Sequence, residues 1–294
     1  MEIRRLGPIG AEILGADVRN MDDAAFAKIY ATWLEHNVIC VRDQTLTLDD
    51  YVAYSRRFGR VLPHPSKSTR HPDCPEITLL GVNKYRADGT LDMDIYRRGA
   101  EGFHTDGSYE EVPFKATQLY ALAIPSRGGD THFSSAYALY DAVPKRIRDR
   151  VEDKCGLYVY GGRKKMNALL NPEDRNEPAR RHPLVQLHKE TGRKLFYFDQ
   201  NKILSIDGLP ANESDAIIAE LTAIMQNPPA QYSHKWRKGD IVIWDNRCSY
   251  HKAAGDYPPE EERIHWRVSI KDWVRDETGT AIKDRAIAGE LAHA

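Results

Sequence analysis

The chain has 294 residues, 41% of them hydrophobic and 29% charged, and its formal net charge is −1. These values are those of an ordinary globular protein with an ample core, and the near-zero charge gives no reason to expect nucleic acid or an anionic membrane as a partner. The sequence contains no run of about eighteen apolar residues, so we expect no membrane span.

The start of the chain and the cysteines predict a cytoplasmic protein. The first residues lack the apolar stretch of a secretory signal. The four cysteines, Cys40, Cys74, Cys155 and Cys248, are scattered and include no Cys-x-x-Cys pair. This spacing argues against a zinc ribbon or a disulfide framework and suits a reducing compartment.

Capping residues and apolar spacing predict the first helices. Asp22 or Asp23 can cap a helix that runs to about residue 36. Residues 38–42 follow as a buried strand, and Thr47 then begins a second helix with a capping-box-like start.

Short strands and two helical segments come next. Alternating and apolar runs predict strands over 76–82, 117–123 and 131–134. Residues 135–143 and 145–153 are expected to be helical.

Two polar segments, 84–102 and 161–182, show no periodicity. Long loops inside a compact domain are usually functional, and the first of them leads directly into His104. We therefore interpret both segments as active-site loops.

The second half of the chain predicts further short strands and one clear helix. We first expect a strand at 157–160 and a hairpin of 184–188 and 194–198. A helix capped by Asn212 follows, and then a hairpin of 232–237 and 240–244 around Lys238-Gly239. The last elements are a strand at 266–270 and a tail from about 278. The chain shows no internal repeat and no phosphate-binding glycine motif. We predict a mainly β protein, a double-sheet barrel with flanking helices, in one domain over 1–294.

His104 and Asp106 carry the first chemical signal. They are two residues apart, so on a strand their side chains share one face. An imidazole and a carboxylate can take two adjacent positions on a metal ion, and a second histidine would complete the facial triad typical of non-haem Fe(II) oxygenases. For an isolated pair, a surface turn is the alternative interpretation.

His251 is the best third ligand. It follows an apolar strand at 241–244 and the polar stretch 245–247. A histidine just past the end of a barrel strand lies at the mouth of the barrel, where sites are built. The alternative is a purely structural histidine.

Arg263 and Arg267 predict an anion site. They are four residues apart, so on a strand both point to one face. Guanidinium groups that face a cavity are costly unless they meet anions, and a dicarboxylate co-substrate or an anionic substrate would supply these. The alternative is a solvated basic edge that faces 260–262.

Further motifs accompany these residues along nearly the whole chain. They are Gly10-Ala-Glu-Ile-Leu-Gly-Ala16, Phe58-Gly59, Pro125-Ser-Arg-Gly-Gly-Asp-Thr131, Gly239-Asp240 and Trp244-Asp-Asn-Arg247. Together with the histidines, the aspartate and the arginine pair, they make the chain similar to the TauD/TfdA family of Fe(II)- and 2-oxoglutarate-dependent dioxygenases.

The resemblance implies a jelly-roll core, that is, a cupin-like double-stranded β-helix. It also implies an enzyme that consumes O₂ and 2-oxoglutarate, hydroxylates a C–H bond of its substrate and releases succinate and CO₂. The residues to which it assigns roles are His104, Asp106 and His251 for Fe(II), and Thr131, Arg263 and Arg267 for 2-oxoglutarate, with Arg267 also beside the substrate.

Substrate contacts are expected at His64, Lys67, Phe103, Tyr160 and Arg267. The resemblance places His64 at a substrate contact, whereas Lys67 and Phe103 differ from the taurine enzyme, so taurine itself is not expected. Cations and tyrosines in the two loops favour a small anionic substrate, with a solvated charged face as the alternative. The candidate classes are a sulfonate, a sulfate ester, an aryloxyalkanoate or an amino-acid derivative.

Two other functions stay open. A zinc hydrolase could use the same two histidines and aspartate, but the sequence offers no general base for it and leaves Thr131 and Arg263 unexplained. A non-catalytic barrel could bind a ligand only, although all three metal ligands are present. The expected partners are small molecules, and because family members often form dimers or tetramers, we add a homo-oligomer as an expectation.

Overall fold

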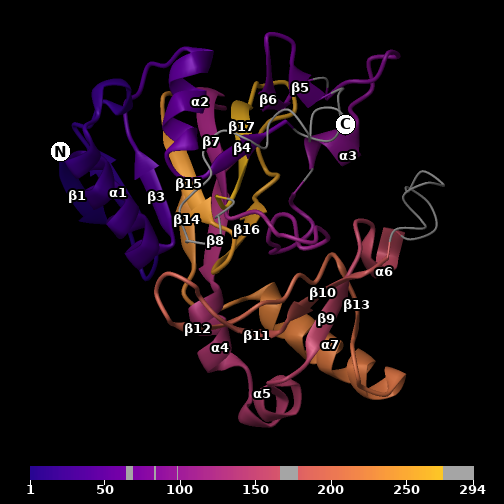
Figure 1. Ribbon diagram of the computed structural model, residues 1–294. Helices are drawn as coiled ribbons and strands as arrows, with labels where there is room; N and C mark the ends of the chain where they lie inside the picture. Colours follow the sequence, from indigo (N-terminus) through magenta and orange to yellow (C-terminus); the bar gives the residue numbers. More distant parts are fainter. Residues whose placement is uncertain (64–68, 83, 98, 166–177, 274–294) are drawn as a thin grey trace.

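Two β-sheets lie against each other in the upper part of the molecule (Figure 1). The computed structural model describes residues 1–63, 69–82, 84–97, 99–165 and 178–273. His64, Lys67 and the predicted tail from about residue 278 lie outside the described residues.

The larger sheet has nine strands in the part of the chain that the structure describes. Their order is β1 (Glu2–Arg5), β2 (Ala11–Leu14), β3 (Val38–Val41), β15 (Ile241–Asp245), β7 (Ala116–Ala123), β17 (Ile264–Lys271), β6 (Cys74–Leu80) and β5 (Arg70–His71), with β4 (Arg60–Leu62) paired to β17. The smaller sheet has the order β14 (Tyr232–His234), β8 (Thr131–Ser135) and β16 (Ser249–Ala253).

A compact apolar core joins the two sheets. It brings Leu119, Val242 and Trp244 of the larger sheet together with Phe133 of the smaller one. The ring centroids of Phe133 and Trp244 are 5.4 Å apart. Two sheets that share one core confirm the predicted double-sheet architecture.

Helices cover the outer side of the larger sheet (Figure 1). They are η1 (Val18–Asn20), α1 (Asp23–His36) and α2 (Leu48–Arg56). Asp22 caps α1 by accepting a hydrogen bond from the Ala25 amide at 2.7 Å, and Thr47 begins α2 with a complete capping box. Both predicted helix starts are therefore confirmed.

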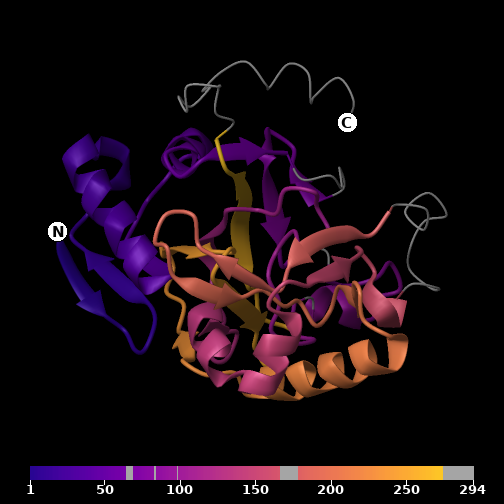
Figure 2. The same ribbon diagram turned by 60° about the horizontal axis from the view of Figure 1, so that its bottom comes forward.

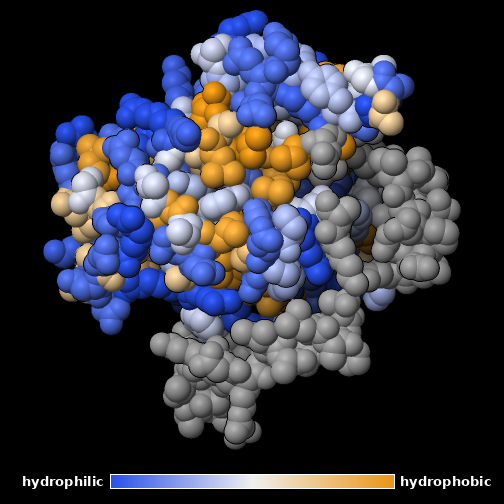
Figure 3. Space-filling model, turned by 90° about the horizontal axis from the view of Figure 1, so that it is seen from above, coloured by the Kyte–Doolittle hydropathy of each residue, from blue (hydrophilic) through white to orange (hydrophobic). Residues whose placement is uncertain are grey.

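The core beneath these helices is only partly closed. Phe26, Leu46 and Leu48 pack against it but keep part of their surface exposed. Seen from above, one face of the molecule shows apolar residues between hydrophilic ones (Figure 3).

The described residues between β8 and β14, 136–165 and 178–231, form a lower module beneath the sheets (Figures 1 and 2). Its elements are α4 (Ala136–Ala142), α5 (Lys145–Val151), β9 (Cys155–Tyr158), α6 (Gly162–Lys165), β10 (Arg180–Pro183), β11 (Val185–Leu187), β12 (Lys194–Phe196), β13 (Ile203–Ile206) and α7 (Ala211–Gln226). Strands β11 and β12 pair as the predicted hairpin.

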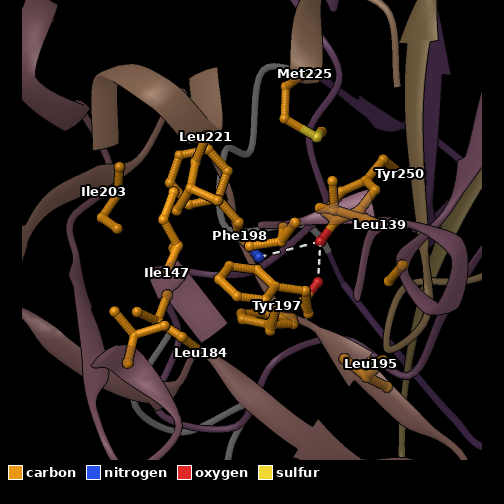
Figure 4. Packing of buried hydrophobic residues seen from close by; sticks show 14 of the residues in the cluster. Leu139, Ile147, Leu184, Leu195, Tyr197, Phe198, Ile203, Leu221, Met225 and Tyr250 are labelled. Atoms are coloured by element: carbon orange, nitrogen blue, oxygen red, sulfur yellow. Dashed lines mark hydrogen bonds between the residues drawn. The ribbon is translucent and has the colours of Figure 1, made fainter. Parts of the chain in front are cut away.

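The lower module has its own apolar core (Figure 4). Two residues from the rest of the chain, Phe103 and Tyr250, are buried in it. The hydroxyl of Tyr250 accepts a hydrogen bond from the Phe198 amide at 3.2 Å and donates to the Phe196 carbonyl. The module is thus fixed to the barrel next to both predicted histidine ligands.

Two local predictions are wrong. Helix α7 begins at Ala211, and Pro210 precedes it without a side-chain cap, so Asn212 lies inside the helix. The turn at 238–239 does not close a hairpin, because β14 pairs with β8 whereas β15 pairs with β3 and β7. Gly239, at φ 85°, instead donates its amide to Ala121 and crosses from one sheet to the other.

The segment 84–102 is not structureless. It contains the short helix α3 (Met93–Tyr96), and the Gly99 carbonyl accepts a hydrogen bond from the Ala253 amide at 2.9 Å. Within the described residues, no helix combines the length and the apolar character that crossing a bilayer requires. That residues 1–294 form a single domain stays a prediction.

Replacing Leu221 by Ala in α7 should destabilise the protein by about 2–5 kcal/mol, because this side chain is fully buried in the core of the lower module and its loss leaves a cavity. Equilibrium denaturation with urea would measure the change. Gln226→Ala, on the exposed side of the same helix, is the control and should change the free energy of unfolding by less than about 0.5 kcal/mol. Equal effects of both substitutions would contradict the role given to this core.

Candidate metal centre

His104 and His251 are brought together by a two-way backbone bridge. The His104 amide donates to the His251 carbonyl at 3.1 Å, and the His251 amide donates to the His104 carbonyl at 2.9 Å. The segment that carries His104 therefore extends the smaller sheet beside β16. The ring centroids of the two histidines are 4.3 Å apart.

Asp106 completes a cluster with the two histidines. One potential ligand atom from each of the three residues lies within 4.8 Å of the other two. The His251 Nε2 atom is 3.6 Å from Asp106 Oδ2. Two imidazoles and one carboxylate, supplied by distant parts of the chain, thus converge as the sequence predicts, and they are the donor set of a non-haem iron site.

Two other clusters in the described residues have similar spacing but different surroundings. They are Cys40, His234 and Asp240, and His188, Asp245 and Cys248. Each carboxylate there already pairs with a guanidinium group, from Arg42 and Arg247 respectively, at 2.6 Å. The histidine and aspartate side chains of both clusters are fully buried, so these clusters are ion-pair networks inside the core.

The protonation states at the first cluster suit a metal cation. Burial and the nearby His104 lower the pKa of His251 to about 3, so its ring is neutral at neutral pH and keeps a lone pair. Burial alone would raise the pKa of Asp106, but Arg267 and the two histidines hold it below its usual value. Asp106 is therefore an ionised carboxylate.

The ring nitrogens are also arranged for metal binding. The Nδ1 atom of His104 lies 3.0 Å from the Gly102 carbonyl, so an Nδ1–H donor there leaves Nε2 free for a metal, as in many metal sites. Nε2 of His251 is the nitrogen that faces Asp106. Its Nδ1 is buried without a hydrogen-bond partner in the described residues. These donors fit Fe(II).

Thr117 and Asn246 hold the carboxylate in place. The Thr117 hydroxyl donates to Asp106 Oδ2 at 2.7 Å, and the Asn246 amide donates to the Thr117 hydroxyl at 2.9 Å. Asn246 in turn accepts from the Trp244 indole at 2.9 Å. Sequence reasoning missed Thr117 and gave Asn246 no role, although the Trp244–Arg247 motif signalled that this stretch matters.

The two predicted arginines have different neighbours. Arg267 pairs with Asp106 Oδ1 at 3.0 Å. Arg263 donates to the Gly129 carbonyl at 2.8 Å and to the Thr131 hydroxyl at 3.3 Å. Burial lowers the pKa of Arg263 to about 10, so at neutral pH this half-buried side chain is still a cation.

The described residues offer Arg263 no carboxylate at ion-pair distance. The Thr131 hydroxyl beside it accepts a further hydrogen bond from the Trp236 indole at 3.0 Å. An arginine and a threonine that share a hydrogen bond, without an acidic partner at ion-pair distance, fit an anionic ligand. This arrangement favours the anion site over the solvated basic edge.

The predicted substrate contacts differ in how much of their surface is exposed. Phe103 is 2% exposed and lies in the core of the lower module, so little of its surface is open to a substrate. Tyr160 is 55% exposed and packs edge-on against Tyr109 at 4.9 Å. A Cβ atom built on Gly99 would lie 3.9 Å from His104 Cε1, so the segment 84–102 does pass beside the cluster.

Along most of its length the chain is similar to known dioxygenases. The profile described as "Taurine catabolism dioxygenase TauD, TfdA family" matches residues 2–269. The (S)-phenoxypropionate/alpha-ketoglutarate-dioxygenase of Sphingobium herbicidovorans is 30% identical over 288 residues, which cover 92% of this chain and 95% of that protein. The alpha-ketoglutarate-dependent sulfate ester dioxygenase of Pseudomonas putida is 29% identical, with 90% and 87% covered.

Solved structures share the fold. A taurine dioxygenase from Burkholderia xenovorans aligns with a TM-score of 0.75 at 27% identity, covering 98% of this chain and 96% of that one. AAD-2 in complex with Mn(II) and N-oxalylglycine aligns with a TM-score of 0.74 at 20% identity, covering 92% and 98%. The mainly β fold with a jelly-roll core and flanking helices is confirmed.

Replacing Thr117 by Val should weaken metal binding by about 10- to 100-fold, because the substitution removes the hydroxyl that holds Asp106 while nearly keeping its volume. Calorimetric titration of the protein with Mn(II) would measure the dissociation constant. Thr117→Ser keeps the hydroxyl and should bind as the wild type does. A valine variant that is folded and binds Mn(II) with unchanged affinity would refute this role.

Proposed function

The chain belongs to the TauD/TfdA family of dioxygenases, and on this premise we propose that His104, Asp106 and His251 bind its Fe(II). The convergence of these three side chains on one point carries the proposal. The enzyme is a 2-oxoglutarate-dependent dioxygenase, with Fe(II) as its metal and O₂ as its oxidant.

When bound, Fe(II) and 2-oxoglutarate activate O₂ to hydroxylate a C–H bond. The reaction balances with two electrons from the C–H bond and two from the oxidative decarboxylation of 2-oxoglutarate. One oxygen atom enters the alcohol product and the other enters succinate, while the carboxylate that is lost leaves as CO₂.

The chain's own residues supply the ligands and their orientation. His104 and His251 offer nitrogen donors, and Asp106 offers a carboxylate. Thr117 fixes the rotation of that carboxylate through its hydrogen bond. Trp244 packs its ring 4.6 Å from that of His251 and helps to exclude water from the protein side of the site.

Arg263 and Thr131 would bind the distal carboxylate of 2-oxoglutarate. Their shared hydrogen bond, the absence of a carboxylate partner for Arg263 among the described residues, and the second donor from Trp236 support this assignment. Arg267 pairs with Asp106 instead. We therefore assign Arg263 to the co-substrate, and Arg267 to the boundary between the metal centre and the substrate.

The substrate would be a small organic anion, and we propose an aryloxyalkanoate first, then a sulfate ester. Relatives that share most of this chain are named for phenoxypropionate and for sulfate esters. The guanidinium of Arg267 could meet the anionic group, because its side chain is 20% exposed. Tyr109 and Tyr160 could pack against an aromatic body. His64 and Lys67 stay in the proposal as further substrate contacts.

Wild-type protein supplied with Fe(II), O₂ and a substrate should convert 2-oxoglutarate to succinate, and His104→Ala should lose at least about 100-fold of this activity because a metal ligand is missing. Chromatographic measurement of succinate tests both. A metal chelator should abolish the activity, and added Fe(II) should restore it. Hydrolysis of a substrate with Zn²⁺, without succinate, would support the hydrolase instead.

A panel of matched compounds would identify the substrate class. We expect conversion of phenoxypropionate, 2,4-dichlorophenoxyacetate or an alkyl sulfate, and little conversion of the neutral amide of the same carboxylate, because only the anion can pair with a guanidinium group. Mass spectrometry of the products measures turnover. Conversion of the neutral compounds alone would refute the anionic class.

Assembly and location complete the proposal. A dimer or tetramer of this chain, and a cytoplasmic location, stay predictions. Light scattering of the purified protein would decide the first of these.

A further inference from the structure

His265 is a buried polar residue for which the proposed reaction has so far given no role. It lies on β17 between the two arginines of the site and is fully buried. Its neighbours across the sheet are Ala121 of β7 and Leu80 of β6, and both belong to or pack against the core between the two sheets. The imidazole therefore faces the interior of the barrel.

Neither nitrogen of the His265 ring has a hydrogen-bond partner in the described residues. Two other fully buried histidines do have partners: His188 binds Asp245, and His234 binds Asp240 and Tyr232. A buried donor or acceptor without a partner costs about 1–3 kcal/mol. A residue whose only role was to fill the core would not need to bear this cost.

The surroundings of His265 belong to the proposed co-substrate pocket. Its ring packs edge-on against Trp236, with centroids 4.4 Å apart. The indole of Trp236 donates to Thr131, and Arg263 donates to the same hydroxyl. His265 and Thr131 thus contact the same side chain, that of Trp236, and Arg263 is bonded to Thr131.

The protonation state of His265 suits a hydrogen-bond donor to an anionic ligand and not a charged partner of that ligand. Burial, with Arg263 and His234 nearby, holds the pKa of His265 well below its usual value. The ring is therefore neutral, with one N–H donor and one acceptor nitrogen. A cation is not its natural ligand, because the neighbouring cationic Arg263 would repel one. A carboxylate held by Arg263 can accept the N–H.

We propose that His265 binds 2-oxoglutarate by donating its ring N–H to the distal carboxylate, as a third donor beside Arg263 and Thr131. The inference rests on the proposed function and extends it. It explains why a polar ring without a protein partner lies inside an apolar core. It also means that this co-substrate contact requires a side chain with a suitably placed N–H donor at position 265.

The test compares His265→Met, which keeps an apolar side chain of similar size without a donor, with His265→Gln, which keeps an N–H. The Mn(II)-loaded full-length proteins would be titrated calorimetrically with 2-oxoglutarate and with oxalate. Oxalate can chelate the metal but has no distal carboxylate. His132→Met, on β8 next to Thr131 and bonded to Ser233, is the matched control.

We expect the methionine variant to bind 2-oxoglutarate about tenfold more weakly, which corresponds to the loss of one hydrogen bond to a charged group. Its affinity for oxalate should be unchanged. The glutamine variant and the His132→Met control should stay within about threefold of the wild type. The melting temperature of the ligand-free methionine variant should not fall, because the substitution removes two unsatisfied polar atoms.

Other outcomes would overturn the inference. A methionine variant with wild-type affinity for 2-oxoglutarate would refute it while leaving the proposed function intact. Equal weakening for oxalate and 2-oxoglutarate, or a lower melting temperature with unchanged affinity, would show a structural role only. If the methionine variant does not fold, the glutamine variant is used as the test. Because glutamine keeps an N–H group, tenfold weaker binding of 2-oxoglutarate by this variant would exclude a role of His265 as a simple hydrogen-bond donor. Failure of the wild type itself to bind 2-oxoglutarate would defeat both proposals.

Discussion

The site depends on one pair of backbone hydrogen bonds, those that join His104 to His251. The two bonds run in opposite directions between segments far apart in the sequence. They place the two imidazoles side by side and leave Asp106 two residues further along the same segment. Backbone bonds of this kind fix a register, and a shift by one residue would turn the side chains to the other face. The proposed metal centre therefore depends first on strand pairing, which brings its side chains together.

The alternation of side chains along the same two segments secures that register. Phe103 and Tyr250, each one residue before a histidine, point the other way and are buried in the core of the lower module. Each segment thus carries a histidine of the proposed site on one face and an aromatic anchor on the other. This explains why Phe103 is buried in a core although it neighbours a histidine of the site, and why the lower module matters to chemistry that takes place in the barrel.

Much of this organisation could be predicted from the sequence, because some features depend only on residues close together in the chain. The capping box at Thr47 is one example, and the spacing of His104 and Asp106 is another. The sequence was less informative about which strands pair with each other. The Lys238-Gly239 pair correctly indicates a turn, but turn residues do not tell which strands they join, and β14 and β15 belong to different sheets. Thr117 and His265 look like ordinary strand residues, and the roles proposed for them rest on the tertiary contacts around them.

The lower module enters and leaves the barrel at neighbouring points, since β8 and β14, which precede and follow it, are paired strands with Tyr232 opposite Phe133. A segment with adjacent ends can be exchanged between homologous barrels by recombination without stretching either host. The aromatic anchors limit which grafts would succeed: a donor segment must bring a cavity for Phe103 and an acceptor for the hydroxyl of Tyr250. Chimeras assembled at residues 135 and 232 would thus exchange the lower module and keep His104, Asp106 and His251 of the parental barrel.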